Sequence, residues 1–180
     1  MTTLSPDPVT EGGAYQRQLL GLLGSDDPAE VQAATADAWR DLVGEAGADL
    51  RARPAAAEWS VVELLGHAVD SELVVSGRYR WILAHDVPAI LGYDQDLWVD
   101  RLHHGADDPD ALLRLFGALR EANLDLWQRT PAGDRQRIGL HSERGPESYE
   151  LTFQLAAGHD RFHLAQARRT LSAVRAAQRT

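Results

Sequence analysis

Apolar residues recur every three or four positions in four long stretches of this 180-residue chain, with polar residues between them. Such spacing places the apolar side chains on one face of an α-helix. The pattern predicts long helices that begin near Asp27, Ser60, Asp108 and Ser148, and a short helix over residues 15–23. The segments 87–107 and 131–146 lack the helical spacing of apolar residues and contain proline and glycine. We therefore expect both to be irregular, and we expect no strands.

Helix start signals support two of these boundaries in particular. Asp27 precedes Pro28, which pairs an N-cap residue with the residue favoured at the first helical position. Ser60 and Glu63 form a capping box, in which each side chain can bond to the backbone N–H of the other residue. We therefore expect the second long helix to run from Ser60 to about residue 85.

Four long amphipathic helices bury their apolar faces most simply in a four-helix bundle. The sequence therefore predicts an all-α fold with a domain over residues 27–180 and an N-terminal arm, with its short helix, over residues 1–26. Ligand sites in such bundles are built from side chains on facing helices.

Composition excludes several chemistries. The chain has no cysteine, which rules out disulfides and a protein thiol nucleophile. All 18 basic residues are arginine, so Schiff-base and P-loop chemistry, which need lysine, are excluded as well. The net charge of −9 opposes nucleic-acid binding. No apolar run is long enough to span a membrane and no signal peptide is evident, so we expect a cytoplasmic protein.

Two histidines provide the main chemical signal. His159 and His163 lie four residues apart in a predicted helix, so both imidazoles can reach one metal ion. No His, Asp or Glu follows His163, which means that a third ligand must lie upstream. His67 is the best candidate because it lies in the middle of an apolar helix. The remaining histidines are at a helix end or in predicted loops and rank lower, and they are His85, His103, His104 and His141.

Three histidines with no fourth protein ligand would form an open, catalytic type of metal site. The alternative is that the pair is partly exposed or hydrogen-bonded in the core. The stretch from His159 to His163 also differs from the His-Glu-x-x-His zinc peptidases: Asp160 is shorter than glutamate, and the downstream ligand is missing. We therefore do not expect a peptidase.

Several motifs occur in one order from about residue 28 to residue 169. They are the segment Glu58–His67 followed by Asp70-Ser71-Glu72, then Arg78-Tyr79-Arg80, Pro88, the turn Gly92-Tyr93-Asp94-Gln95, Trp98, the stretch His141–Gly145, and finally His159–Gln166. Together they resemble the DinB-like superfamily, and the segment from Pro88 to Trp98 is most similar to its branch of bacillithiol transferases and metal-dependent hydrolases.

The resemblance implies a four-helix bundle of the up-down-down-up type with zinc or nickel held by His67, His159 and His163. It also implies a reaction of a small thiol, bacillithiol or mycothiol, with an electrophile, and a homodimer. In this hypothesis the metal binds the thiolate. The predicted substrate-binding residues are Arg78, Arg80, Tyr93 and Trp98. For both arginines, the alternative is a solvated helix face.

Two other functions remain open. The metal can instead activate water for hydrolysis, with Asp70, Glu72 or Asp160 as a base or as a partner that orients a histidine. All three acids can also be ordinary surface charges. The third hypothesis is a protein that binds a metal or small ligand without catalysis.

Overall fold

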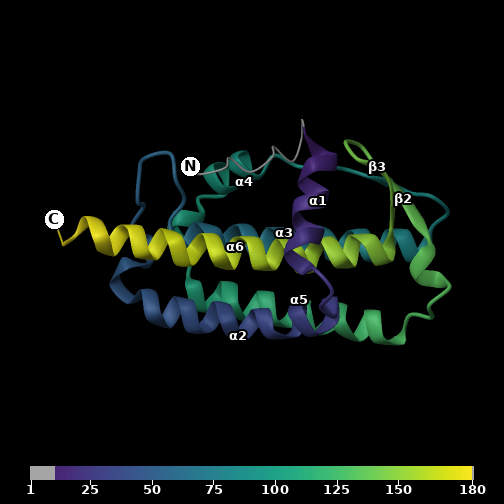
Figure 1. The fold of residues 1–180 in the computed structure, drawn as a ribbon, viewed down its shortest axis with the longest axis horizontal. Helices are drawn as coiled ribbons and strands as arrows, with labels where there is room; N and C mark the ends of the chain where they lie inside the picture. Colours follow the sequence, from purple (N-terminus) through teal and green to yellow (C-terminus); the bar gives the residue numbers. More distant parts are fainter. Residues whose placement is uncertain (1–10, 180) are drawn as a thin grey trace.

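Four long helices form the body of the protein in a computed structural model that describes residues 11–179 (Figure 1). They pack along their length, which buries the apolar face of each helix against its neighbours. The four helices are α2 (Pro28–Ala46), α3 (Val61–Ala84), α5 (Pro109–Arg129) and α6 (Tyr149–Ala177). The prediction of a four-helix bundle is therefore confirmed.

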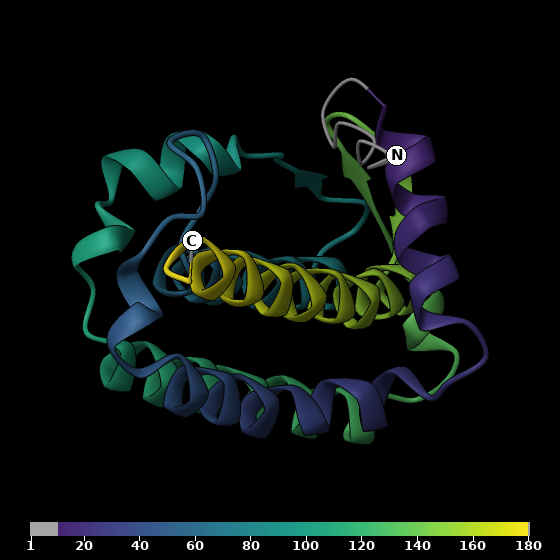
Figure 2. The same ribbon diagram turned by 60° about the vertical axis from the view of Figure 1, so that its left-hand side comes forward.

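The bundle has two layers, one formed by α2 and α5 and the other by α3 and α6 (Figure 2). Helices α2 and α6 run in one direction, and α3 and α5 run in the opposite direction (Figure 1). Although α2 and α3 follow each other in the sequence, each packs mainly against α5 and α6, so the two lie on a diagonal. The order of directions is up, down, down, up, as the resemblance implied.

The long helices begin where the capping residues predicted. The Asp27 carboxylate accepts a hydrogen bond from the Ala29 N–H at 2.8 Å, and the Ser148 hydroxyl accepts one from the Leu151 N–H at 3.0 Å. At the start of α3, the Glu63 carboxylate accepts from the Ser60 N–H at 2.8 Å. These bonds satisfy backbone groups that have no partner inside the helix.

A layer of buried polar residues divides the core into two apolar clusters. One cluster is centred on Trp39, Leu64 and Phe116, and the other contains Trp127 and Phe153, whose rings stack 4.0 Å apart. On each bundle helix, the polar residues lie between these clusters. The polar layer consists of Gln32 and Thr35 of α2, Glu72 and Ser76 of α3, Arg120 and Asn123 of α5, and Asp160 of α6.

Both segments expected to be irregular contain regular structure, so that prediction was wrong in part. They supply the strands β1 (Ala89–Ile90), β2 (Ile138–His141) and β3 (Gly145–Ser148), and the short helix α4 (Gln95–Arg101). Strand β2 pairs parallel with β1 and antiparallel with β3. Strands of two to four residues are too short to show an alternating pattern, and β1 and β2 are far apart in the sequence. The 3₁₀ helices are η1 (Gly47–Arg51), η2 (His104–Ala106) and η3 (Asp134–Gln136).

The short N-terminal helix α1 (Gly12–Leu23) crosses α6 on the outside of the bundle (Figure 1). Gly158 lies at the crossing, where a Cβ atom would be only 2.2 Å from the Leu19 carbonyl oxygen. Arg161 holds the end of α1 by donating hydrogen bonds to the carbonyls of Leu22 and Leu23, at 2.8 and 3.1 Å. Residues 1–10 of the predicted arm lie outside the described residues, and the division at residue 26 stays a prediction.

Among residues 11–179, no helix combines the length and the apolar composition needed to cross a lipid bilayer.

Candidate metal centre

Three histidine side chains converge where α3 faces α6. The Nε2 atom of His67 lies 3.2 Å from Nε2 of His159 and 3.2 Å from Nε2 of His163. One nitrogen from each ring lies within 4.8 Å of the other two. The structure thus brings together the three histidines that the sequence singled out.

Local structure explains this convergence. His159 and His163 are four residues apart on α6, so their rings project from the same face, with centroids 4.2 Å apart. His67 is 1% exposed and approaches from α3, with the Trp59 ring packed against it at 5.2 Å. Because α3 and α6 are neighbours in one layer of the bundle, the three rings meet between them.

The spacing of the nitrogens suits a divalent metal. In a tetrahedral site with metal–nitrogen bonds of about 2.0–2.1 Å, the ligand nitrogens are about 3.3–3.4 Å apart. The two 3.2 Å separations around His67 are close to that value. Without an ion, two facing imidazole nitrogens can form a hydrogen bond only if one of them is protonated and donates to the other. A shared cation uses all three lone pairs, so the residues present fit a metal.

Burial keeps the three imidazoles neutral, as metal ligands must be. It lowers the pKa of His67, His159 and His163 well below the usual value. The charge of another histidine of the cluster lowers each of these pKa values further. Nδ1 of His163 lies 3.0 Å from the Gln166 side-chain oxygen. That bond places the ring proton on Nδ1 and leaves the Nε2 lone pair free for an ion.

A sequence model of the DinB superfamily matches residues 29–167, which include all three histidines. The chain belongs to the DinB superfamily. The resemblance noted from the ordered motifs is thereby confirmed.

This DinB-superfamily chain is also similar to a solved structure, YfiT from Bacillus subtilis, with 21% sequence identity and a TM-score of 0.75. The match covers 82% of this chain and 85% of YfiT, which is described as a probable metal-dependent hydrolase with an unusual four-helix bundle topology. At this level of identity the likeness establishes the fold. No curated protein matches the chain in a sequence search.

A cavity of about 90 Å³ lies beside the histidine cluster, and His67 and His159 form part of its wall. It is large enough for more than one water molecule. Its other walls come from α1, α3, α6, the segment before α4, the first residue of α4, and the turn between β2 and β3. They are formed by Tyr15, Gln16, Leu19, Ser71, Val75, Arg78, Gly92, Tyr93, Gln95, Glu143, Arg144, Thr152, Leu155 and Ala156.

The predicted base Asp70 has a different partner. Its carboxylate lies 2.7 Å from Nε2 of His104, and Nδ1 of the same ring lies 2.6 Å from Asp107. Burial raises the pKa of Asp70, and the bond to His104 opposes that shift. His104 thus joins the η2 segment to α3, and Gly66 leaves the space for its ring, which would lie 2.6 Å from a Cβ there.

The other two predicted bases, Glu72 and Asp160, belong to the polar layer. Arg120 donates to Glu72 at 2.8 Å and to both oxygens of Asp160, at 2.5 and 3.1 Å. Burial raises the pKa of Glu72, an effect opposed by Arg120. None of the three predicted acids lies among the described residues of the cavity wall, which instead includes the exposed carboxylate Glu143.

The predicted substrate-binding residues have different outcomes. Arg78 is 7% exposed and lines the cavity, so the alternative of a solvated helix face was wrong for this residue. Arg80 is exposed and turns toward α5, where it donates to the Asn123 side chain at 3.0 Å. Tyr93 lines the cavity, and Trp98 packs on its ring at 4.5 Å. Their roles in binding stay predictions.

Sequence reasoning missed most of the cavity wall, including Tyr15, Gln16 and Arg144. These residues come from α1 and the β2–β3 turn, whose positions depend on tertiary contacts. Of the histidines ranked lower, His85 and His103 are exposed, while His141 is buried in β2 away from the cluster.

Proposed function

We propose that this protein is a metal-dependent enzyme that transfers a small thiol, such as bacillithiol or mycothiol, to an electrophilic molecule bound in the cavity. One observation carries the proposal: neutral imidazoles form part of the cavity wall, while the buried acids nearby are bonded to His104 and Arg120. His67, His159 and His163 would hold a zinc or nickel ion with one position open, and the ion would supply the charge that lowers the pKa of a thiol, so no carboxylate base would be needed.

The protein's own residues would hold and shield the reactants. Leu19, Val75 and Leu155 supply apolar surface on the cavity wall, which suits an apolar electrophile and excludes water. In the reaction, sulfur forms a bond to the electrophilic carbon while that carbon loses its bond to the leaving group. The thiol proton is released to water.

Two measurements test the proposal. Elemental analysis of the purified protein should find one zinc or nickel ion per chain, and His159→Ala should lose it, whereas the exposed His85→Ala variant should keep it. The loaded protein should accelerate the conjugation of monochlorobimane only when bacillithiol or mycothiol is present. Metal binding without thiol-dependent acceleration would contradict a transferase.

Hydrolysis is the second candidate, favoured by the description of YfiT as a probable metal-dependent hydrolase. Water would then be the nucleophile, and a carboxylate of the cavity wall would accept its proton. Glu143 is the acid in that position. Ester hydrolysis by the wild type that is lost in Glu143→Gln, with metal content unchanged, would favour this function over thiol transfer.

A protein that binds metal without catalysis is the remaining alternative. For such a protein we expect one ion per chain and loss of the ion in His159→Ala. We expect neither thiol conjugation of monochlorobimane nor ester hydrolysis.

A further inference from the structure

We propose that Arg78 anchors a subsite for a carboxylate, so that the cavity takes a small molecule with an anionic end. The substrate's role as thiol or electrophile rests on the proposed function, but the anion-binding subsite does not. Its evidence is the environment of Arg78.

Arg78 is buried, and no acidic side chain of residues 11–179 forms an ion pair with it. Its Nη2 donates to the Leu91 carbonyl oxygen at 2.7 Å, and its Nε is buried and has no hydrogen-bond partner among the described residues. A buried guanidinium normally pairs with a carboxylate, because the loss of hydration is otherwise uncompensated. Since Arg78 also lines the cavity, an anionic ligand is the partner that this site can take from solution.

The nearest buried carboxylate is already neutralised. Arg144 donates to both oxygens of Glu147, from Nε at 2.5 Å and from Nη2 at 3.1 Å, and Gln16 donates to the same carboxylate at 2.6 Å. Arg144 and Glu147 therefore cancel each other's charge, which leaves the charge of Arg78 in excess on this wall. The exposed Glu143 is well hydrated and offsets little of it.

His141 reports the same positive field. It is 3% exposed, and its pKa is lowered to about 4 by burial and by the charges of Arg144 and Arg78, which outweigh the opposing charge of Glu147. Burial is the larger cause, but the electrostatic contribution has the sign expected where positive charge exceeds negative charge on this wall.

The position of Arg78 defines the shape of the ligand. It follows His67 by eleven residues on α3, about three turns, so both side chains leave the same face of the helix about 16 Å apart along its axis. The cavity touches both residues. A ligand with its carboxylate at Arg78 and its reactive atom at the histidines would therefore carry these two groups at opposite ends.

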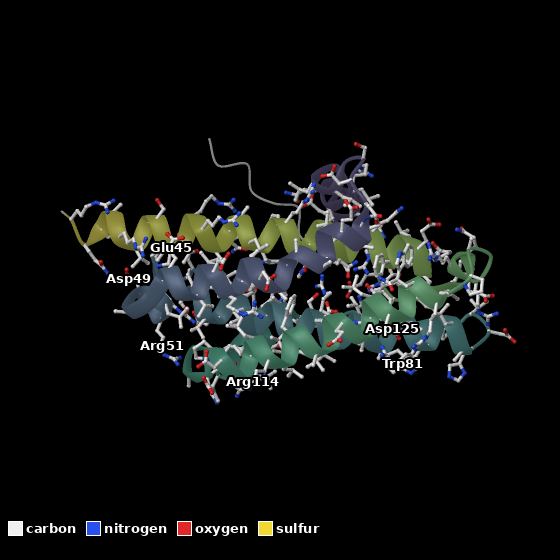
Figure 3. All side chains as sticks on the ribbon, turned by 90° about the horizontal axis from the view of Figure 1, so that it is seen from below. Glu45, Asp49, Arg51, Trp81, Arg114 and Asp125 are labelled. Atoms are coloured by element: carbon white, nitrogen blue, oxygen red, sulfur yellow. The ribbon has the colours of Figure 1, made fainter. Side chains whose placement is uncertain are left out.

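Anion binding to metal-free protein tests the subsite independently of catalysis. Isothermal titration should detect binding of succinate. It should detect no binding of dimethyl succinate, which lacks the charge, and inorganic phosphate should bind more weakly than succinate. Arg78→Gln should weaken succinate binding about 10- to 100-fold, the range expected for hydrogen bonds to a charged group. The matched control is Arg114→Gln, since Arg114 is exposed on the outer face of α5 (Figure 3), and it should bind like the wild type.

Arg144→Gln is a second test if Arg78→Gln does not fold. It leaves the Glu147 carboxylate without its ion pair beside the subsite, so it should also weaken succinate binding. Equal succinate affinity in the wild type and in the folded cavity variants would overturn the proposal, as would no binding to the wild type. Tighter binding of phosphate than of succinate would overturn the carboxylate assignment. Failure of the bimane assay alone would count against thiol transfer and leave the subsite intact.

Discussion

Arg120 of α5 donates two hydrogen bonds to Asp160 of α6, the residue that directly follows His159. The two neighbours on α6 face different environments: His159 lines the cavity, and Asp160 lies in the polar layer. A rotation of about 100° per residue makes this possible. The ion pair therefore holds α6 in the orientation that directs His159 toward His67.

Removing one member of this buried pair should be costly. Asp160→Ala leaves Arg120 with Glu72 as its remaining acidic partner, and we expect a loss of about 3 kcal/mol in the free energy of unfolding, measured with urea. The control is Asp125→Ala, which removes an exposed pair with Arg129 and should change stability little. Equal effects of the two substitutions would contradict a structural role for the polar layer.

Gln166 should affect metal affinity without being a ligand. Its side-chain oxygen holds the ring of His163, so Gln166→Ala should weaken zinc binding about 10- to 100-fold in competition with a chromophoric chelator. Gln128→Ala, on the exposed surface of α5, serves as the control and should match the wild type. An unchanged affinity in Gln166→Ala would show that the histidine orients itself without this bond.

His104 should make a pH-dependent contribution to stability. Burial alone would lower its pKa, but the bonds to Asp70 and Asp107 outweigh burial and raise it. A raised pKa in the folded state stabilises the protein fully below about pH 6.5, the unfolded value, and the contribution is lost as pH rises through the folded pKa. The difference in unfolding free energy between wild type and His104→Gln, measured by urea denaturation, should therefore shrink above pH 6.5. A difference that grows with pH would contradict this.

Gly158 should be intolerant of a side chain. A methyl group there would collide with the Leu19 carbonyl, so Gly158→Ala should displace α1 from α6 and lower the thermal midpoint. Gly117→Ala is the matched control, because a Cβ at Gly117 would meet no atom of the described residues within 4 Å. Alanine is the better helix former, and Gly117→Ala should raise stability by about 0.5–1 kcal/mol. Calorimetry on both variants measures the contrast.

The sequence was sufficient for the parts of the molecule that local rules control. Asp27 and Ser148 begin helices because their side chains bond to backbone N–H groups two or three residues away. The spacing of His159 and His163 places them on one face of any helix. The prediction of His67 as the third ligand required one further assumption, that the apolar helix containing it packs against that face.

The cavity wall was less predictable because it depends on distant pairing. Arg78 is buried only when the segment around Leu91, held by the pairing of β1 with β2, lies over it, and strands this short leave no periodic signal. Arg120, in contrast, has a recognisable position in the sequence. It lies between Phe116 and Trp127 at the spacing of buried positions, where an arginine implies an acidic partner inside the bundle.

The histidines and most of the cavity wall come from separate parts of the architecture. The histidines are on two packed bundle helices, whereas Tyr15, Tyr93 and Arg144 come from a crossing helix and two connecting segments. Substitutions in those segments can change what the cavity admits without moving the nitrogens. Part of the ligand selectivity can therefore change independently of the three nitrogens, which makes these segments the place to redesign what the cavity admits.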